Sequence, residues 1–395
     1  MENSRVELKK MLERSTNIVK RTDVFDIAWL PPNIVLREPI KELFLQAGAF
    51  VKYRHPNNLL VVGAPGTGKT LSARVLMSEI HDLKKTDLEC VYVNCRDKNA
   101  IDIIGDIYGE ELRGVSGPEA ISKFLETGKK DYLIILDEID RAKGVNQLLY
   151  LLSRPKEVNM KCPINISLIL VTNNIEWDRE LDAATRSSLQ LSTIIFERYE
   201  VKQLVSILKF RAKLAFDNNR AVDDPVLNYI ANIVFREADS DTRAALRILL
   251  AAAQDAEKRG SDIVSKANVD KIYKEELERL EKLRIESLGL HRLLMALAIA
   301  ETSSGTATDI YNHYRRIAIK MKMYPKQKST FYYDTNYLAS QGLVVREHRS
   351  TKKGRVLMIV PKIDKTVIQS IAAKRLSFTV DTEAENSASE ELKPH

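Results

Sequence analysis

The chain contains 395 residues, of which 44% are hydrophobic and 29% are charged. This length suits two or three domains of about 150 residues each, with more than one hydrophobic core. No segment approaches the ~18 uninterrupted apolar residues that a membrane-spanning helix needs, so an integral membrane protein is excluded. Residues 1–20 carry charge throughout and lack the apolar core of a secretory signal, so we expect a cytoplasmic protein.

Cysteine and histidine give no sign of a metal centre or a disulfide framework. The three cysteines, Cys90, Cys95 and Cys162, match no metal-ligand spacing, and we interpret them as buried small apolar residues. The six histidines show no metal-ligand spacing and no partnership with a candidate nucleophile. Hydrolysis of bonds other than a phosphoanhydride therefore finds no support in the sequence.

The net charge of +7 is concentrated near the C-terminus. Residues 286–376 contain 16 Lys and Arg against 6 Asp and Glu, whereas residues 377–395 contain 1 against 5. This asymmetry indicates a polyanionic partner for the basic segment, although a solvated basic face is the alternative. The acidic tail is rich in Ser, Glu and Ala and cannot bury enough apolar surface to fold, so we expect it to be disordered.

Between residues 58 and 197, short apolar runs alternate with helical patterns. The runs are LLVV at 59–62, CVYV at 90–93, YLIIL at 132–136, ISLILVT at 166–172 and STIIF at 192–196. Short, largely β-branched runs of this kind are typical of buried parallel strands. The sequence therefore predicts a doubly wound α/β domain with a parallel sheet.

Two further regions follow this domain. Residues 198–284 show four helical patterns separated by cap and stop signals, which predict a small helical bundle. Residues 286–376 show three helices, a strand, a basic turn, a second strand and a last helix, the order of a winged helix-turn-helix. We expect domains at residues 1–197, 198–285 and 286–376, followed by the tail at 377–395.

The strongest motif is GAPGTGKT at Gly63–Thr70, which follows an apolar strand and precedes a helical pattern. Its glycines allow the backbone to wrap around phosphate, the helix N-terminus adds positive charge, and Lys69 reaches the terminal phosphates. The Thr70 hydroxyl is a ligand for Mg²⁺. A chance glycine-rich turn is the alternative. The expected phosphate-binding residues are Gly63, Ala64, Pro65, Gly66, Thr67, Gly68, Lys69, Thr70 and Leu71.

The strand YLIIL ends in Asp137 and Glu138, at the edge of the sheet where α/β proteins bind ligands. We expect Asp137 to hold Mg²⁺ through water and Glu138 to orient or deprotonate the attacking water. Alone, an apolar run that ends in two acidic residues is a weak signal, because a helix N-cap can have the same pattern. Its occurrence together with Gly63–Thr70 makes the signal strong.

Two further residues complete the expected catalytic set. Asn173 follows the strand ISLILVT, and its amide can hold the γ-phosphate or the lytic water, although asparagine also forms turns. Arg243 stands at the start of a bundle helix whose expected cap is Asp241, and from there it can reach the γ-phosphate. The alternative for Arg243 is a surface arginine on a capped helix. The catalytic candidates are thus Lys69, Asp137, Glu138, Asn173 and Arg243.

Together these residues resemble the Walker A, Walker B, sensor-1 and sensor-2 elements of AAA+ ATPases. With a C-terminal winged helix, the chain resembles the archaeal origin-recognition and helicase-loading initiator family over about residues 20–376. Further similar segments are VLREPI at 35–40, VYVNCR at 91–96, LDAATRSSL at 181–189, FERY at 196–199 and SDTR at 240–243.

The resemblance implies additional contacts. Val35, Arg37 and Ile40 would lie near adenine, and the segment from Lys98 to Arg113 would form an insertion that touches DNA. The cofactors would be ATP or ADP with Mg²⁺. The partners would be double-stranded origin DNA, the replicative minichromosome-maintenance helicase and sibling initiators on DNA.

The chain departs from the family at the expected position of its trans-acting arginine finger. The family has a Pro-Arg pair after LD, whereas this chain has Ala183 and Ala184, with Arg186 two residues further on. If Arg186 does not reach the γ-phosphate of a neighbour, hydrolysis would be slow. The ATP site would then act as a long-lived switch and the protein as a weak ATPase.

In a helix-turn-helix, the second helix of the motif lies in the major groove of DNA. Here that helix covers about residues 329–341, and Phe331, Thr335 and Leu338 fall on its core side. The residues expected to face outward are Ser329, Thr330, Tyr332, Tyr333 and Asn336, with both tyrosines exposed. The expected phosphate and minor-groove contacts are Lys326, Lys328, Lys352, Lys353 and Arg355. A wing that binds another protein is the alternative.

The sequence thus predicts a nucleotide-switched initiator that binds origin DNA and, by resemblance, recruits or loads the helicase. Two other functions share its motifs. A clamp-loader-like AAA+ remodeller would need a stable oligomer and an effective arginine finger. A nucleotide-sensing winged-helix transcription regulator would bind promoters rather than one repeated origin element.

Overall fold

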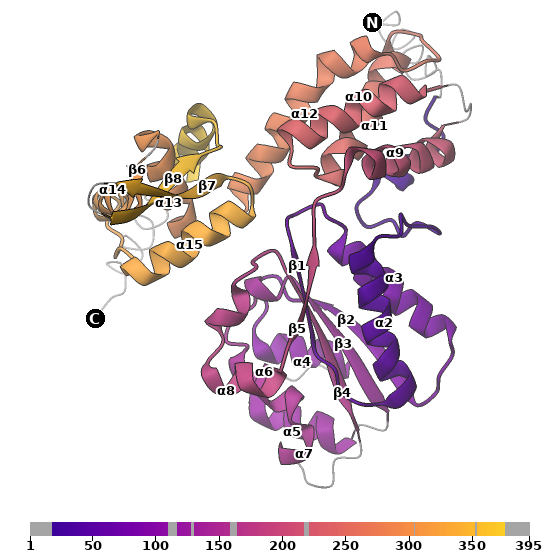
Figure 1. The fold of residues 1–395 in the computed structure, drawn as a ribbon, viewed down its shortest axis with the longest axis vertical. Coiled ribbons are helices and arrows are strands. Elements are labelled where there is room, and N and C mark those ends of the chain that lie inside the picture. The colour runs from indigo at the N-terminus through magenta and orange to yellow at the C-terminus, as the bar shows by residue number, and fades with distance from the viewer. Residues whose placement is uncertain are drawn as a thin grey trace, which may run out of the picture. The chain divides into compact units, whose positions relative to one another are not determined.

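The computed structural model of the chain describes residues 18–109, 117–127, 130–158, 164–216, 221–303, 305–351 and 354–375. The chain forms two compact units, and the boundary between them falls between Ile272 and Tyr273 (Figure 1). The first unit contains a parallel sheet with its covering helices and a bundle of helices. The second unit contains helices around a small antiparallel sheet.

The sheet of the first unit has five parallel strands in the order β2-β3-β4-β1-β5. In chain order the strands are β1 (Leu59–Gly63), β2 (Leu88–Asn94), β3 (Asp131–Asp137), β4 (Ile166–Thr172) and β5 (Ser192–Phe196). All five predicted strands are confirmed. Every residue of β4, in the middle of the sheet, is buried, as expected for a sheet covered on both faces.

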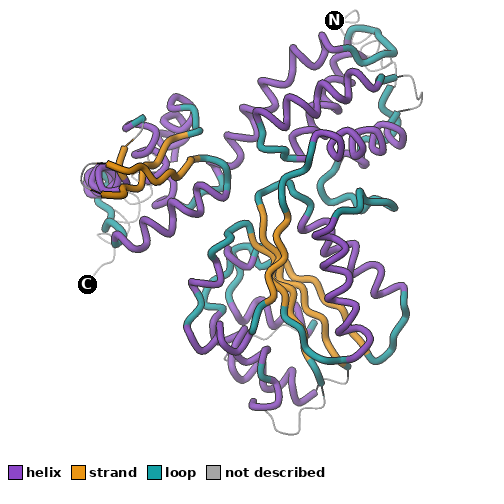
Figure 2. Tube along the Cα trace, viewed as in Figure 1, coloured by secondary structure: helices purple, strands orange, loops and turns teal. Residues whose placement is uncertain are grey.

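Helices cover both faces of this sheet, as predicted for a doubly wound layer (Figures 1 and 2). Successive residues of β1 alternate between two hydrophobic clusters, because side chains of a strand point to opposite faces. One cluster includes helices α2 (Glu38–Tyr53) and α3 (Lys69–Asp82), and the other includes α4 (Ala100–Tyr108), α5 (Gly117–Thr127) and α6 (Asn146–Ser153). The short helices are η1 (Asp23–Phe25), η2 (Ile139–Arg141), α7 (Pro155–Val158), η3 (Trp177–Glu180) and α8 (Ala183–Leu189).

The predicted helical bundle consists of α9 (Val201–Ala215), α10 (Asp224–Glu237), α11 (Thr242–Lys258) and the first part of α12 (Lys266–Glu286). Asp241 caps α11, as expected, by accepting a hydrogen bond from the backbone N–H of Arg243. The segment that precedes α2 packs on the bundle. Arg211 of α9 donates to the carbonyl of Val24 and lies over the Trp29 ring. We call this bundle the lid.

The second unit has the predicted element order of a winged helix. Its helices are α13 (Leu290–Thr302), α14 (Ala307–Lys320), α15 (Lys328–Ser340) and a last helix over residues 365–375. Strands β7 (Val344–Thr351) and β8 (Gly354–Pro361) pair in antiparallel fashion and form the wing. A short strand, β6 (Gly305–Thr306), pairs with β8 and extends the sheet to three strands.

Helix α15 packs on the core as its sequence predicts, because Phe331, Thr335 and Leu338 are all buried. Asp334 and Tyr337 are also buried, which the sequence analysis did not anticipate. Asp334 is 1% exposed and accepts a hydrogen bond of 2.7 Å from Nε of Arg292. The guanidinium of Arg292 also lies 3.9 Å from the centre of the Tyr337 ring.

The expectation of two exposed tyrosines on α15 is corrected by the structure. Tyr332 is half-buried, packs against the core of the unit and makes an edge contact with the Phe331 ring. Tyr333 is half-buried as well, with its ring 5.9 Å from the Arg292 guanidinium. The fully exposed aromatic residue of this region is Tyr324, in the turn before α15, which is 95% exposed.

Cys90 and Cys95 are buried, as expected, and burial raises the pKa of both thiols to about 12, so both stay protonated. Cys162 and the tail at 377–395 lie outside the described residues. Within the described ranges, no helix is both long enough and apolar enough to cross a bilayer. The same ranges contain no group of three or more residues suited to hold a metal ion through His, Cys, Asp and Glu alone.

Replacing Arg292 with methionine should destabilise the second unit by about 3 kcal/mol, because the buried Asp334 carboxylate loses its guanidinium partner. Native-state hydrogen exchange of the α15 amides measures this local opening free energy in the full chain. The matched control is Arg349→Met, which breaks an exposed pair with Glu347 and should cost no more than about 1 kcal/mol. Equal protection of α15 in both variants would contradict the expectation.

Candidate functional site

The loop Gly63–Thr70 connects β1 to α3, as predicted, and α3 begins at Lys69. Gly66 and Gly68 have φ values of +77° and +89°, in the left-handed region that favours glycine. The unpaired backbone N–H groups of the first turn of α3 therefore open onto the loop, and the helix dipole adds positive charge there. This combination favours an anion.

Lys69 is 6% exposed and folds back along the loop. Its Nζ donates to the carbonyls of Gly63 at 2.7 Å and Ala64 at 2.8 Å. Burial lowers the pKa of Lys69 to about 8, against the opposing attraction of Asp137. The ammonium is thus held in a poorly solvated position where a bound anion would stabilise its charge.

The acidic pair at the end of β3 is divided between two environments. Asp137 is 2% exposed, and its Oδ2 accepts a hydrogen bond of 2.7 Å from the Tyr92 hydroxyl. Glu138 adopts a left-handed backbone with φ +53° and forms an ion pair of 2.9 Å with Nε of Arg96. Burial raises the pKa of Glu138, and Arg96 opposes that rise.

Asn173 follows β4 directly and lines the same cavity. Its neighbour Asn174 is buried and serves the loop, since its amide donates to Glu180 and accepts from the N–H of Glu176. Asn173 is half-buried, and among the described residues no hydrogen bond of its side chain is seen. Of the two amides, Asn173 is therefore the one placed to meet a ligand.

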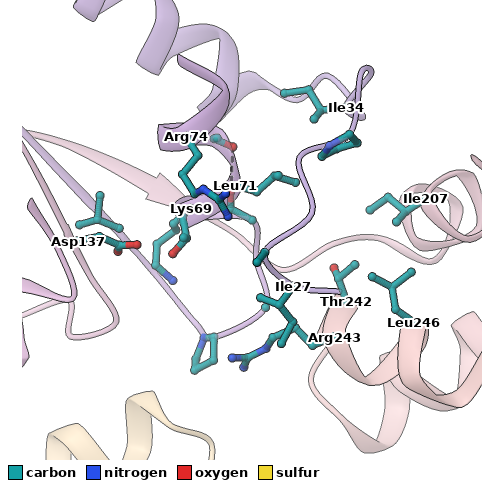
Figure 3. Close-up of a pocket in the computed structure, with 18 of the residues that line it drawn as sticks. Ile27, Ile34, Lys69, Leu71, Arg74, Asp137, Ile207, Thr242, Arg243 and Leu246 are labelled. Carbon is teal, nitrogen blue, oxygen red and sulfur yellow. Dashed lines mark hydrogen bonds between the residues drawn. The ribbon is translucent and has the colours of Figure 1, made fainter. Parts of the chain in front are cut away.

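The lid contacts the loop through the N-terminus of α11. The N–H of Thr242 lies 3.4 Å from the carbonyl of Gly66. Nε and Nη2 of Arg243 donate to the two carboxylate oxygens of Asp241, at 3.0 and 2.8 Å. Figure 3 shows Arg243 between the lid helix and the loop, with its guanidinium directed toward the loop.

These groups surround a cavity of about 580 Å³. Lys69 and Asp137 lie at one side of it, and the lid residues Ile207 and Leu246 lie at the other (Figure 3). The cavity thus combines charged groups at one side with apolar lid side chains at the other, which suits a phosphorylated ligand that also carries an apolar group. Of the predicted residues, those that line it are Val35, Ile40, Pro65, Gly66, Gly68, Lys69, Thr70, Leu71, Asp137, Glu138, Asn173 and Arg243.

Arg37 does not line the cavity, contrary to its expected position near adenine. It is buried behind the loop, where Nη2 donates to the carbonyl of Thr67 at 2.6 Å and Nη1 to that of Glu197 at 2.9 Å. Its guanidinium also lies 3.9 Å from the centre of the Tyr199 ring. Arg37 therefore braces the loop against the segment that leads to the lid.

Several residues of the cavity were missed by the sequence analysis: Asp26, Ile27, Asn33, Arg74, Tyr92 and Tyr199. The sequence did carry a signal for Tyr92, because this residue places a hydroxyl-bearing ring in an otherwise apolar strand. It lies two residues before Asn94, which pairs with Asp137 at the edge of the sheet. Asp26, Ile27 and Asn33 had none, because the chain before α2 has no helical or strand pattern.

Lys98, at the start of the expected insertion, and Arg186, the candidate arginine finger, both form contacts within this chain. Lys98 pairs with Asp106 of α4, whose isoleucines pack on the sheet, and Arg113 lies outside the described residues. The guanidinium of Arg186 donates to three carbonyls, those of Asp178, Arg179 and Leu181, at 2.9 to 3.0 Å.

The expected DNA-contacting residues of the second unit differ in their exposure. Lys328 and Ser329 are exposed, and Lys328 lies 3.4 Å from the Thr308 hydroxyl. Lys326 is half-buried, 3.5 Å from Asp334. Thr330 and Tyr333 are half-buried, Arg355 is exposed, and Lys352 and Lys353 lie outside the described residues.

Comparisons with known proteins agree with this geometry. An AAA domain profile matches residues 52–179, and a Cdc6 AAA+ ATPase-type lid domain profile matches residues 205–274. The chain is 29% identical to an ORC1-type DNA replication protein 1 of Sulfurisphaera tokodaii, over 93% of this chain and 96% of that protein. It is 27% identical to an ORC1-type DNA replication protein of Cenarchaeum symbiosum, over 77% and 78%.

Solved structures share the fold. The Aeropyrum pernix ORC1 protein in complex with DNA superposes with a TM-score of 0.65 at 24% identity, covering 91% of this chain and 97% of that one. The Aeropyrum pernix ORC2 protein superposes with a TM-score of 0.63 at 20% identity, covering 91% and 100%. These likenesses support the arrangement of an α/β core, a lid and a winged helix.

The five-stranded sheet, the glycine loop and the helical lid that closes on it define an AAA+ ATPase with a C-terminal winged helix. The matched lid and the full-length relatives narrow this class. The chain belongs to the ORC1/Cdc6-type family of archaeal DNA replication initiators.

The depressed pKa of Lys69 predicts how ADP affinity depends on pH. Bound phosphate favours the protonated lysine, whereas the free protein loses this proton above about pH 8. Binding then takes up a proton, so the affinity should fall by up to about tenfold per pH unit above pH 8. Titrations with a fluorescent ADP from pH 7 to 9.5 measure this slope.

The matched control is Lys69→Arg, whose guanidinium stays charged throughout that range. Whatever its absolute affinity, this variant should show a flat profile. Parallel curves for the two proteins would mean that Lys69 stays protonated in the free protein, against the expectation.

Proposed function

We propose that this protein is a DNA replication initiator switched by ATP and ADP, which binds double-stranded origin DNA and recruits or loads the replicative minichromosome-maintenance helicase. The observation that carries the proposal is the direct contact between the lid and the phosphate-binding loop, at Thr242 and Gly66. Because both lid and loop line one cavity, a nucleotide bound there would touch both. We therefore expect the γ-phosphate of the nucleotide to determine the angle of the lid relative to the loop.

The cavity residues fit ATP or ADP and a magnesium ion. Lys69 would neutralise the terminal phosphates, while Val35 and Ile40 would lie against adenine. The Thr70 hydroxyl and the buried Asp137 carboxylate are oxygen donors of the type that Mg²⁺ prefers, and the ion would screen phosphate charge. Tyr92 holds Asp137 in place through its 2.7 Å hydrogen bond.

The remaining site residues would handle the attacking water. Glu138 would accept the proton of this water. Burial raises the pKa of the Glu138 carboxyl toward neutral pH, which suits a general base. Asn173 would orient the water or the γ-phosphate through its amide. Arg243 would contact the γ-phosphate from the lid.

We propose that hydrolysis is slow and serves as a switch. The three carbonyl contacts of Arg186 support this, because they would have to break before the guanidinium could reach a neighbouring subunit. Loss of the γ-phosphate would release Arg243 from the nucleotide and allow the lid angle to change.

The proposed parts of the chain are an ATPase domain at residues 1–197, a lid at 198–285 and a winged helix at 286–376. The basic excess of the last part supports DNA as its partner. Helix α15 would enter the major groove of the DNA. The residues of this helix and of the segment before it that would contact the DNA are Lys326, Lys328, Ser329, Thr330 and Tyr333. Those of the wing are Lys352, Lys353 and Arg355. Lys98 and Arg113 would add contacts from the ATPase domain. Tyr324, which is 95% exposed in the segment before α15, would join them.

Glu138→Gln should lower ATP turnover by roughly 100-fold or more, because the amide cannot accept the proton of the attacking water. Nucleotide affinity should stay close to that of the wild type, since Lys69 and the loop are unchanged. Phosphate release measures turnover, and fluorescent ATP measures binding. Lys69→Ala should lose the binding itself and serves as the comparison. Unaltered turnover in the glutamine variant would defeat the role assigned to Glu138.

Lys328→Ala should weaken duplex binding to a similar extent on every sequence. It should also reduce the slope of log K against log salt by about 1, because one phosphate contact is removed. Fluorescence anisotropy at several salt concentrations gives the slope. The control is Lys156→Ala, an exposed lysine of the ATPase domain, which should leave the slope unchanged. If the wild type itself binds with a flat salt dependence, the electrostatic argument for DNA fails.

A further inference from the structure

Asp241 makes more hydrogen bonds with Arg243 than a helix cap requires. The cap needs one oxygen, and Oδ1 accepts the backbone N–H of Arg243 at 3.0 Å. The same carboxylate also accepts Nε of Arg243 on Oδ1 and Nη2 on Oδ2, at 3.0 and 2.8 Å. The two side chains are thus joined side-on along one edge of the guanidinium, the geometry of a strong charge-assisted pair.

This pair sits directly on the phosphate-binding loop. A Cβ atom added to Gly66 would lie 2.1 Å from Oδ1 of Asp241 and 2.8 Å from its Cα, so the loop admits the carboxylate only because residue 66 has no side chain. Two consecutive residues with left-handed backbones, Asp239 and Ser240, deliver Asp241 to this position. Left-handed pairs without glycine are uncommon and persist where the surrounding structure fixes them.

Burial makes the pair difficult to break. The Asp241 side chain is 1% exposed, whereas that of Arg243 is 35% exposed and lines the cavity. Withdrawing Arg243 would remove two charge-assisted hydrogen bonds from a carboxylate that water does not reach. Arg243 must therefore meet a ligand without leaving Asp241, using the N–H groups on the edge of the guanidinium that Asp241 does not occupy.

We propose that Asp241 is a positioning residue that sets the preference of the site for a nucleoside triphosphate over a diphosphate. It fixes the guanidinium of Arg243 so that the remaining donors meet the third phosphate at one place. The inference rests on the proposed function, because it assumes that Arg243 contacts the γ-phosphate. Asp241 and Arg243 both belong to the lid, so the donors that would recognise the third phosphate are already in position before a nucleotide binds.

Two simpler roles for Asp241 give different outcomes. If Asp241 is only a cap, asparagine should replace it without effect, because the two residues cap helices about equally well. If its negative charge merely repels phosphate, asparagine should strengthen binding of the more highly charged triphosphate relative to the diphosphate. If Asp241 positions Arg243, the relative affinity for the triphosphate should fall.

The experiment measures the affinities of the full chain for a non-hydrolysable ATP analogue and for ADP, both with Mg²⁺, by calorimetry. For Asp241→Asn we expect the ratio of the two affinities to shift toward ADP by roughly tenfold, the effect of about one charge-assisted hydrogen bond. Asp223→Asn is the matched control, because Asp223 caps the neighbouring helix α10 and is not among the residues that line the cavity. It should leave the ratio unchanged.

Arg243→Ala and the double variant separate the proposal from the function on which it rests. Arg243→Ala should lose the triphosphate preference, and adding Asp241→Asn should then change nothing further. An unchanged or increased ratio in Asp241→Asn, with a collapsed ratio in Arg243→Ala, would overturn the positioning role and leave the proposed function intact. An unchanged ratio in Arg243→Ala would instead remove the γ-phosphate contact itself, and both would fall.

Discussion

The structure depends on one steric constraint, which is that the phosphate-binding loop has almost no room beside its glycines. A Cβ atom at Gly63 would lie 2.3 Å from the carbonyl of Phe196, and one at Gly68 would lie 2.4 Å from the Tyr199 hydroxyl. Gly66 is closed off in the same way by Asp241. The loop is thus packed against the last strand, the segment that leads to the lid, and the lid itself, so its shape and the lid's position are coupled.

This tight packing also buries the charged side chains around the loop. Lys69 and Asp137 in the cavity and Asp241 beside the loop are all buried, and each charge is stabilised by specific partners rather than by water. The ammonium of Lys69 donates to two carbonyls, and burial lowers its pKa although the Asp137 carboxylate acts in the opposite direction. An anion at the charged side of the cavity would complete the set. The lowered pKa of Lys69 therefore favours an anionic ligand in the cavity that the lid also lines.

The sequence predicted the features whose signals are local. The strands, the lid helices and the loop Gly63–Thr70 each carry their pattern within a few residues, and all lie where they were expected. Arg37 was misplaced because its role is set by carbonyls of Thr67 and Glu197, 30 and 160 residues away. Asp26, Ile27 and Asn33 were missed for a related reason, since the chain before α2 packs on the lid and has no helical or strand period of its own.

The same chemical device occurs twice in the molecule, with different consequences. In the second unit, Asp334 is 1% exposed and pairs with Arg292, whose other face is covered by the Tyr337 ring. In the lid, Asp241 is 1% exposed and pairs with Arg243, whose other edge opens into the cavity. The hydrogen bond and the ring contacts of the first arginine lie within its own unit, so its evident role is to hold that unit together. Arg243 lines the cavity as well, and this difference, which sequence alone does not reveal, supports the proposal that Arg243 contacts a ligand.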